Sequence, residues 1–237
     1  MNDWQQRTKL LLGEDRFQKL QNSKVLVAGL GGVGGYVVEQ LVRAGLGEIT
    51  IADSDTVQES NINRQIIALH STLGKKKTDI IKSRAIDINP EVKINTVNDF
   101  LIGKNIELLL KEKFDFVVDA IDTLTPKIDF IYHAVQNKHL LVSSMGSGGK
   151  TNASLIQIAD FKKTINCRLA FFLRKKLRKK GITGGFPVVF STEQTDKDSV
   201  VETNGENNKK SIVGTISYIP AIFGCFCASV VIDGLTQ

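Results

Sequence analysis

A chain of 237 residues, 42% of them hydrophobic, is long enough to bury a substantial core, most simply as one domain. Its net charge of +6 favours an anionic partner, but many ordinary enzymes share this bias, so charge alone excludes little. The three cysteines, Cys167, Cys225 and Cys227, form no CxxC pair, which excludes the usual zinc framework and suits a reducing cytoplasm. Residues 1–17 carry charges on both sides of a very short apolar run, so we expect no secretory signal.

Strand and helix patterns alternate over the first two-thirds of the chain. "KVLVAG" (24–29) is an apolar run that ends at a glycine, as expected of a strand buried on both faces. "GYVVEQLVRAG" (35–45) has the apolar stripe of a helix that ends at its last glycine. Further strands are predicted at residues 47–53, 92–97, 114–120 and 139–144, and further helices at 76–89 and from Thr125–Pro126 onward. This order predicts an α/β fold of the Rossmann-like, doubly wound kind, with a mainly parallel sheet and helices on both faces.

The pattern changes after Ser144. Residues 153–160 predict one more strand and residues 165–180 a basic helix. Residues 195–210 have almost no apolar content and predict a mobile loop. We therefore predict a single domain, residues 1–237, made of a helical arm (1–23), a core (24–145) and an extension (146–237) that includes the closing helix.

Residues 212–232 lack any charge and are long enough to span a bilayer. Ser, Thr, Gly and Pro220 interrupt the run, and Asp233 follows it at once. We therefore favour a fully buried closing helix over a membrane anchor, and we expect no association with membranes.

The glycine-rich segment "GLGGVG" lies between the first predicted strand and helix. Gly29, Gly31 and Gly34 occupy the fingerprint positions that permit a tight turn, close approach of backbone to phosphate, and tight packing of helix on strand. The following helix N-terminus offers free N–H groups and a partial positive charge to an anion. Asp53, at the end of the second predicted strand, can accept hydrogen bonds from ribose hydroxyls. The motif predicts nucleotide binding without separating NAD from an adenine mononucleotide, and the additional Gly32 hints that a phosphate chain approaches closely.

The charged residues that follow favour a triphosphate over NAD. A triphosphate needs cations to offset its charge while the bond beside the α-phosphate breaks, and a nicotinamide enzyme has no evident need for them. Arg64 can bind two phosphate oxygens with its planar guanidinium, whereas Lys77 acts as a point charge. Asp119 and Asp122 follow the fourth predicted strand, at the sheet edge where ligands of such folds bind. One carboxylate there suits Mg²⁺, although each of these residues taken alone is also compatible with an ordinary surface charge.

"GLGGVG", "DSDTVQESNINRQ", "GKKK" and "DAIDT" occur in order, and residues 5–145 thereby resemble the ubiquitin-activating superfamily of adenylating enzymes. The resemblance implies that ATP is the nucleotide and that a carboxylate attacks its α-phosphate. It implies that Asp122 binds Mg²⁺ and that Arg7, Arg64, Lys77 and Asp122 are catalytic. The implied ATP-binding residues are Gly29, Gly31, Gly32, Gly34, Asp53, Asp55, Asn61, Arg64, Gln65, Lys77 and Asp122. Arg7 would enter the site of a neighbouring subunit, which implies a homodimer; the alternative is a solvated residue on an amphipathic helix.

No acidic residue occurs from Phe161 to Thr192, while nine lysines and arginines do. Leu169, Phe172, Leu173 and Leu177 form an apolar stripe, so this segment predicts an amphipathic helix with a cationic outer face. A phosphate backbone is the more common reason for charge of a single sign at this density. A solvated helix and an acidic membrane surface are the alternatives.

"SSMGSGGK", "QIADFKKT", "LRKKLRKKGI" and "GTISYIPAIFG" extend the likeness over most of the chain, which is similar to the tRNA threonylcarbamoyladenosine dehydratases. This resemblance implies that ATP adenylates the threonine carboxylate of the modified adenosine, after which a nitrogen of the same modification closes a ring and expels AMP. Together with the cationic segment described above, it predicts a tRNA-binding surface. The predicted tRNA-binding residues are Lys163, Arg168, Arg174, Lys175, Arg178 and Lys179. "NCRLAFFLRKK" departs from the more usual "DPLARKLRK", so no role is carried over for the absent aspartate. Glu193, in "STE", is assigned no chemistry.

Two other functions stay open at this point. Relatives that activate a small sulfur-carrier or ubiquitin-like protein often use paired CxxC motifs or a catalytic cysteine. This chain lacks the pairs, and only Cys167 lies in a basic segment that could activate a thiol. A nucleotide-regulated RNA- or membrane-binding module without turnover is the third possibility. A sulfur-transfer partner, such as a cysteine desulfurase system, is compatible with either enzyme.

Overall fold

Seven strands form one sheet in the computed structural model, which describes residues 3–195, 197–202 and 211–237. The strand order is β3-β2-β1-β4-β5-β7-β6, and all neighbours are parallel except β6, which is antiparallel to β7. The strands are β1 (Lys24–Ala28), β2 (Glu48–Ala52), β3 (Lys93–Val97), β4 (Phe116–Asp119), β5 (Leu141–Ser144), β6 (Ile156–Asp160) and β7 (Pro187–Ser191). The helices are α1 (Gln6–Leu12), α2 (Glu14–Gln21), α3 (Gly34–Ala44), α4 (Lys77–Ile88), α5 (Lys104–Leu109), α6 (Leu124–Gln136), α7 (Arg168–Arg178) and α8 (Tyr218–Thr236).

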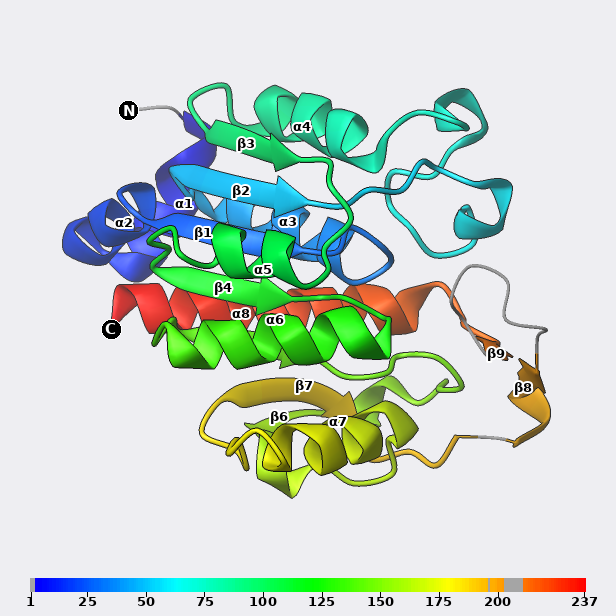
Figure 1. The fold of residues 1–237 in the computed structure, drawn as a ribbon. Helices are drawn as coiled ribbons and strands as arrows, with labels where there is room; N and C mark the ends of the chain where they lie inside the picture. The colour runs from blue at the N-terminus through cyan, green and yellow to red at the C-terminus, as the bar shows by residue number, and fades with distance from the viewer. Residues whose placement is uncertain (1–2, 196, 203–210) are drawn as a thin grey trace.

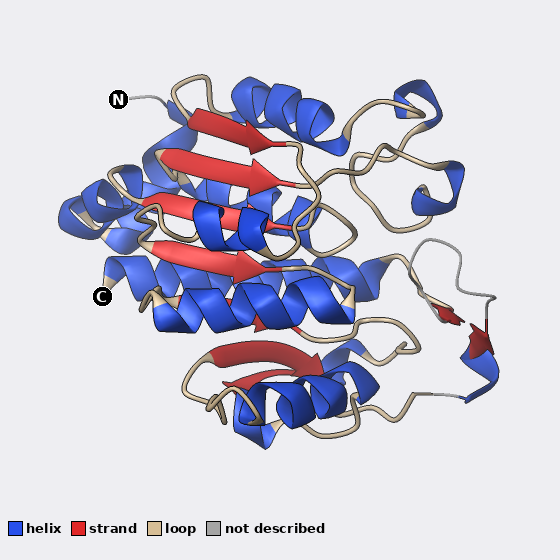
Figure 2. Ribbon diagram, in the orientation of Figure 1, coloured by secondary structure: helices blue, strands red, loops and turns tan. Residues whose placement is uncertain are grey.

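Helices cover both faces of the sheet, which confirms the predicted doubly wound fold (Figures 1 and 2). One core joins the sheet to α3, α4 and α8, and the other joins it to α5, α6 and α7. Strand β1 shows why its sequence is continuously apolar: Val25 and Val27 belong to the first core, and Leu26 and Ala28 to the second. A strand buried on both faces has no solvated side on which to place polar residues.

The strand order reverses between β1 and β4, because β2 and β3 lie on one side of β1 and the later strands on the other. Loops that leave neighbouring strands in opposite directions open a crevice at the carboxyl edge of such a sheet. The glycine-rich segment leaves β1 there, and Asp122 follows β4. The predicted strands and helices of residues 24–144 that frame this crevice are confirmed. The short α5 and two 3-10 helices, Glu59–Asn61 and His70–Thr72, were not predicted.

The second part of the chain departs from the prediction in two places. Strand β7, parallel to β5, was not predicted. The predicted loop at residues 195–210 is wrong in part, because Val200–Glu202 (β8) pairs antiparallel with Ser211–Val213 (β9). Short, exposed strands of this kind have no buried apolar face to reveal them in the sequence. Residues 196 and 203–210 of the predicted loop lie outside the described residues.

The closing helix α8 begins six residues later than predicted and continues past Asp233 to Thr236. It is long and apolar enough to cross a membrane by length and composition, yet half of its most apolar window is buried within the fold. Ile219, Phe223 and Cys227 pack into the core, whereas Cys225 is exposed. The prediction of full burial is therefore wrong, since a helix that is apolar all round does not reveal which face packs.

Candidate nucleotide-binding site

The glycine-rich segment forms the turn from β1 into α3, and its glycines differ in what they do. Gly29 has a φ of 88°, and a Cβ there would lie 2.7 Å from the carbonyl oxygen of Ala120. A Cβ on Gly34 would overlap the carbonyl oxygen of Gly29. Both positions therefore need glycine for packing alone. Gly31 differs, because among the described residues a Cβ there would meet the Gln65 amide nitrogen alone, at 3.8 Å. The turn therefore leaves room for a ligand at this position.

Gly32 has a packing neighbour that the sequence pattern does not reveal. A Cβ at this position would lie 3.0 Å from the Cβ of Pro220 in α8 and 3.4 Å from Arg64. The absence of a side chain thus lets the closing helix and Arg64 lie against the turn. This contact explains the additional glycine without a phosphate, and it brings Arg64 to the nucleotide loop.

Asp53 is held at the carboxyl end of β2 by two backbone donors. One carboxylate oxygen accepts a hydrogen bond from Leu30 N at 2.6 Å, and the other accepts one from Asp55 N at 2.8 Å. Burial raises the pKa of this carboxyl above its ordinary value, against the opposing effect of Lys77. Each oxygen retains a second lone pair, so the carboxylate can still accept hydrogen bonds from a ribose.

Lys77, the first residue of α4, points back toward the same carboxylates. Its ammonium lies 2.8 Å from Asp55 and 3.9 Å from Asp53. The Lys77 side chain is only 5% exposed, whereas the Asp55 side chain is 67% exposed. A buried cation paired with a solvated carboxylate can exchange that partner for a phosphate at little cost, because water receives the released carboxylate.

Arg64 and Gln65 approach the turn from the segment between β2 and α4. The Arg64 guanidinium donates to the Ser60 carbonyl and the Asn63 amide oxygen, each at 2.8 Å, in a half-exposed position. Gln65 is 7% exposed, and its side-chain oxygen has no hydrogen-bond partner among the described residues. Asn61 accepts a hydrogen bond from Gln58 N and so shapes this segment. The unpartnered buried oxygen of Gln65 is an acceptor, so a hydroxyl or amino group of a bound ligand would satisfy it.

A buried ion pair underlies the loop that carries the exposed Asp122. Lys127 and Asp119 are both fully buried and lie 2.7 Å apart. The Ser143 hydroxyl donates to Asp119, and Lys127 also donates to the Ile121 carbonyl. Burial raises the pKa of the Asp119 carboxyl, and Lys127 opposes this effect. This network holds residues 119–121 in place, and Asp122 is the next residue of the same loop.

Lys127 was not among the site residues predicted from the sequence. The signal was present, because Lys127 lies on the same helical stripe as Ile131 and Ala134, which are fully buried. A lysine on a buried stripe requires a partner, and Asp119 at the end of the preceding strand is that partner.

The basic segment forms α7, which packs against α6 with Ala170, Leu173 and Leu177. The predicted apolar stripe is wrong at Phe172, which is 36% exposed. The predicted tRNA-binding residues Lys163, Arg168, Lys175, Arg178 and Lys179 are all exposed. Arg174 is not, since its guanidinium donates to the carbonyl and the hydroxyl of Thr164 and thereby ties the helix to the preceding turn.

Glu193 and Lys150 organise the loops that leave β5 and β7. The Glu193 carboxylate accepts hydrogen bonds from Thr151 N and Oγ1 and from Asn152 N. Partial burial raises the pKa of Glu193, but these hydrogen bonds outweigh it, so the pKa lies below its ordinary value. Lys150 is 3% exposed and donates to the carbonyls of Asn166 and Glu193. Burial lowers its pKa, so both residues act here as loop anchors.

The family model described as "ThiF family" matches residues 5–237 of the chain. This protein belongs to the ThiF family. The tRNA threonylcarbamoyladenosine dehydratase of Haemophilus influenzae is 37% identical over 233 residues, which span 94% of this chain and 89% of the relative. The enzyme of the same name from Bacillus subtilis is 41% identical over 187 residues, 79% of this chain and 74% of the relative. The predicted resemblance to these dehydratases is confirmed.

Among solved structures, the Escherichia coli tRNA N6-threonylcarbamoyladenosine dehydratase in complex with ATP matches this ThiF-family chain with a TM-score of 0.88. The two are 33% identical, and the match covers 99% of this chain and 96% of that one. The same E. coli enzyme has also been solved with AMP. The likeness therefore includes the extension after β5 as well as the nucleotide-binding part.

The three thiols of this ThiF-family chain occupy different positions: two belong to α8 and one caps α7. Cys227 is fully buried in α8, which raises its pKa to about 12, and Cys225 lies on the outer side of the same helix. The sulfur of Cys167 accepts a hydrogen bond from Ala170 N at 3.4 Å and so caps α7. Cys167 thus occupies a capping position that is more often filled by Asp, Asn, Ser or Thr.

Arg7 lies on α1, close to the end of the sheet at which the strands begin (Figure 1). The nucleotide loop lies at the opposite, carboxyl edge, so Arg7 does not contribute to the crevice of its own chain. Helix α1 has no buried residue, and Leu10 and Leu11 are 78% and 79% exposed.

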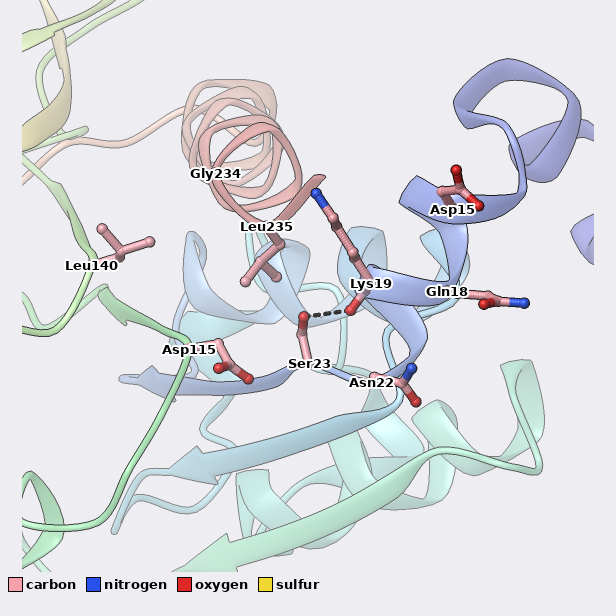
Figure 3. A pocket seen from close by; sticks show the side chains of 9 residues that line it. All are labelled: Asp15, Gln18, Lys19, Asn22, Ser23, Asp115, Leu140, Gly234 and Leu235. Atoms are coloured by element: carbon pink, nitrogen blue, oxygen red, sulfur yellow. Dashed lines mark hydrogen bonds between the residues drawn. The ribbon is translucent and has the colours of Figure 1, made fainter. Parts of the chain in front are cut away.

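A polar hollow of about 600 Å³ also lies at the amino-terminal edge, between α2 and the end of α8 (Figure 3). Asp15, Lys19, Asp115 and Leu235 line it, and the Ser23 hydroxyl donates to the Lys19 carbonyl at its wall. None of the predicted site residues lines this hollow, so it is distinct from the nucleotide-binding crevice.

Proposed function

We propose that this protein is an ATP-dependent tRNA threonylcarbamoyladenosine dehydratase. The observation that carries the proposal is the full-length likeness to the ATP-bound E. coli dehydratase, which includes the extension after β5. A match confined to the nucleotide-binding part would leave the activation of a small carrier protein equally well supported. The crevice agrees with ATP, because Gly31 is open to a ligand and Gln65 offers it an unpartnered buried oxygen.

In the proposed reaction, the threonine carboxylate attacks the α-phosphate of ATP, an acyl adenylate forms and pyrophosphate leaves. Arg64 turns from Ser60 and Asn63 to phosphate oxygens, and Lys77 exchanges Asp55 for phosphate. These two cations stabilise charge that develops as the bond beside the α-phosphate breaks. Asp53 accepts hydrogen bonds from the ribose and fixes the position of the nucleotide.

The second step closes a ring. A nitrogen of the same modification attacks the activated carbonyl carbon, AMP leaves, and the nitrogen gives up its proton, so the net change is the loss of one water. The attack is intramolecular and therefore has a large entropic advantage over attack by a second molecule. No enzyme thiol is needed, in agreement with the structural positions of Cys167 and Cys227.

Asp122 is the residue that would hold Mg²⁺, from the loop after β4. Among the residues that the structure describes, no three His, Cys, Asp or Glu side chains gather into a metal-binding group. A site with one carboxylate, phosphate oxygens and waters is the arrangement that suits Mg²⁺. When bound, Mg²⁺ would neutralise part of the charge of the phosphates.

The test is to incubate the pure protein with ATP, Mg²⁺ and tRNA that carries threonylcarbamoyladenosine, and to weigh the digested nucleoside. We expect its mass to fall by that of one water, with one AMP formed per product. Asp122→Ala and Arg64→Ala should each lose about a hundredfold in rate, and Lys82→Ala, an exposed cation of α4, should match the wild type. An unchanged nucleoside, with AMP formed only when a small carrier protein is added, would replace this proposal with a carrier-protein activator. ATP binding without AMP under any condition would indicate a non-catalytic module.

The proposal includes a homodimer in which Arg7 acts in the partner's site and the exposed Leu10 and Leu11 are covered. Mixing Arg7→Ala with Asp122→Ala should restore part of the activity, because a heterodimer would contain one intact composite site. Heterodimers without recovered activity would contradict the shared site. A tRNA substrate also leads us to propose a cytoplasmic enzyme.

A further inference from the structure

Two neighbouring phenylalanines lie on the surface of α7 instead of in its core. Phe171 is 55% exposed and Phe172 is 36% exposed. Their ring centroids are 5.4 Å apart, with the rings inclined at 75°. The packing face of the helix consists of other residues, among them Leu173 and Leu177, which are fully buried. The two rings are therefore available to a ligand, and folding alone does not explain them.

Cations surround the pair. Helical spacing places Arg168 and Lys176 one turn before and one turn after Phe172, and Lys175 one turn after Phe171. The Arg168 guanidinium lies over the Phe172 ring, 5.8 Å from its centroid. No acidic residue occurs between Asp160 and Glu193, so no carboxylate of this segment offsets the positive charge.

The pair also lies close to the edge of the sheet that holds the nucleotide-binding crevice. Cys167, which caps α7, lies 3.6 Å from the position that a Cβ on Gly146 would occupy. Gly146 follows β5 at the carboxyl edge of the sheet. Phe171 is one helical turn beyond this cap, since its amide donates to the Cys167 carbonyl.

We propose that Phe171 and Phe172 form a stacking surface for unpaired bases of the RNA substrate. Charge complementarity selects this occupant, because a polyanion satisfies the surrounding cations while its bases cover the rings. Aromatic side chains beside a cationic track are the usual means of binding single-stranded nucleic acid. The identity of the RNA as tRNA rests on the proposed function; the stacking contact does not depend on turnover.

The test compares two RNAs of equal length, a stem-loop with an unpaired loop and a perfect duplex, in fluorescence anisotropy titrations. Phe171→Ala/Phe172→Ala should weaken binding of the stem-loop by at least about tenfold and leave duplex binding unchanged. The slope of log affinity against log salt should also stay constant, because no phosphate contact is removed. Phe171→Tyr/Phe172→Tyr should bind as the wild type, and Ile158→Ala, an exposed apolar residue on β6, serves as the matched control.

A direct readout comes from Phe172→Trp, whose fluorescence should be quenched by the stem-loop and not by the duplex. The proposal would be overturned if the double alanine variant lost the same affinity for the stem-loop and the duplex, or lost affinity for neither. A variant that binds RNA normally but changes its association state in ultracentrifugation would show that the rings contact a protein, and would overturn it too. If the RNA-binding results are as expected but the protein does not dehydrate the modified nucleoside, the proposed function is refuted and the stacking surface is still supported.

Discussion

Two lysines near the crevice and the cations on α7 differ in burial and in pairing with carboxylates. Around the crevice, Lys127 and Asp119 are fully buried as a pair, and Lys77 is buried against Asp53 and Asp55. On α7, among the described residues, no lysine or arginine forms an ion pair with a carboxylate, and most are exposed. Buried paired charges hold atoms in place, whereas exposed charges of one sign attract a polyanion.

The crevice itself contains both a closed pair and an exchangeable one. Asp119 and Lys127 satisfy each other with help from Ser143, and water reaches neither side chain. Lys77 is also buried, with 5% of its side chain exposed, but its partner Asp55 is solvated. We infer that the first pair supports the fold of the loop after β4, while the second keeps a cation ready for a phosphate. The following substitutions test that distinction.

The largest effect is expected from Lys127→Met, which leaves the Asp119 carboxylate buried without its partner. Breaking a buried pair in this way costs about 3–5 kcal/mol of folding free energy. Urea unfolding followed by circular dichroism measures it. Asp119→Asn/Lys127→Met should regain much of the loss, because no charge is then buried alone. A single variant within about 1 kcal/mol of the wild type would show that the pair is not structural.

Lys77→Met should act on the reaction far more than on the fold. Its partner Asp55 is exposed and can be solvated, whereas the phosphates of ATP lose a cation in the transition state. We expect about a hundredfold slower exchange of pyrophosphate into ATP with bound substrate, and a smaller loss of stability than in Lys127→Met. The neighbouring exposed lysine supplies the control, Lys75→Met, which should behave as the wild type. A Lys77 variant that unfolds as readily as Lys127→Met would remove the distinction between the two pairs.

Three exposed cations lie at the end of α7: Lys175 and Arg178 in its last turn, and Lys179 directly after it. Reversing all three to glutamate should leave stability nearly unchanged. It should weaken tRNA binding and reduce the slope of log affinity against log salt by about 2 to 3, if each cation neutralises one phosphate. The control is a variant that reverses three exposed lysines on other surfaces, Lys82, Lys104 and Lys113, and changes the net charge by the same amount. An equal loss with this control would mean that net charge, and not α7, governs binding.

The contrast between these regions also explains what sequence could predict. Runs such as Val25–Ala28 are predictable because parallel strands buried on both faces leave no other pattern. The turn at Gly29 and Gly34 is predictable because its backbone excludes every side chain. The pairing of Lys127 with Asp119 is a tertiary contact, and it shows in sequence only as a lysine on an apolar stripe.

The extension after β5 was harder to predict, since its elements are defined by what they pack against. Phe172 belongs to the apolar pattern of α7 by residue type, yet the helix turns it outward. Helix α8 is apolar all round, so its boundaries and its buried face depend on the sheet beneath it. Lys150 and Glu193 look like surface charges until the loops after β5 and β7 are brought together.

The smallest effect is expected from Glu193→Gln, which tests a carboxylate of the extension that accepts hydrogen bonds from a neighbouring loop. The amide keeps one acceptor oxygen for the backbone of Thr151 and Asn152, and the side chain is partly solvated. The loss at neutral pH should therefore be below about 1 kcal/mol.

The pH dependence of this loss gives the sharper result. The pKa of Glu193 is below its ordinary value of 4.5 in the folded state, so the carboxylate stabilises the fold above pH 4.5. That contribution disappears as the pH falls through the lower, folded-state value. The unfolding free energies of wild type and Glu193→Gln should thus differ at pH 7 and converge under acid conditions. Glu91→Gln, an exposed glutamate beside β3, should show no such convergence; a difference that is constant with pH would mean that the Glu193 carboxylate does not anchor its loop by charge.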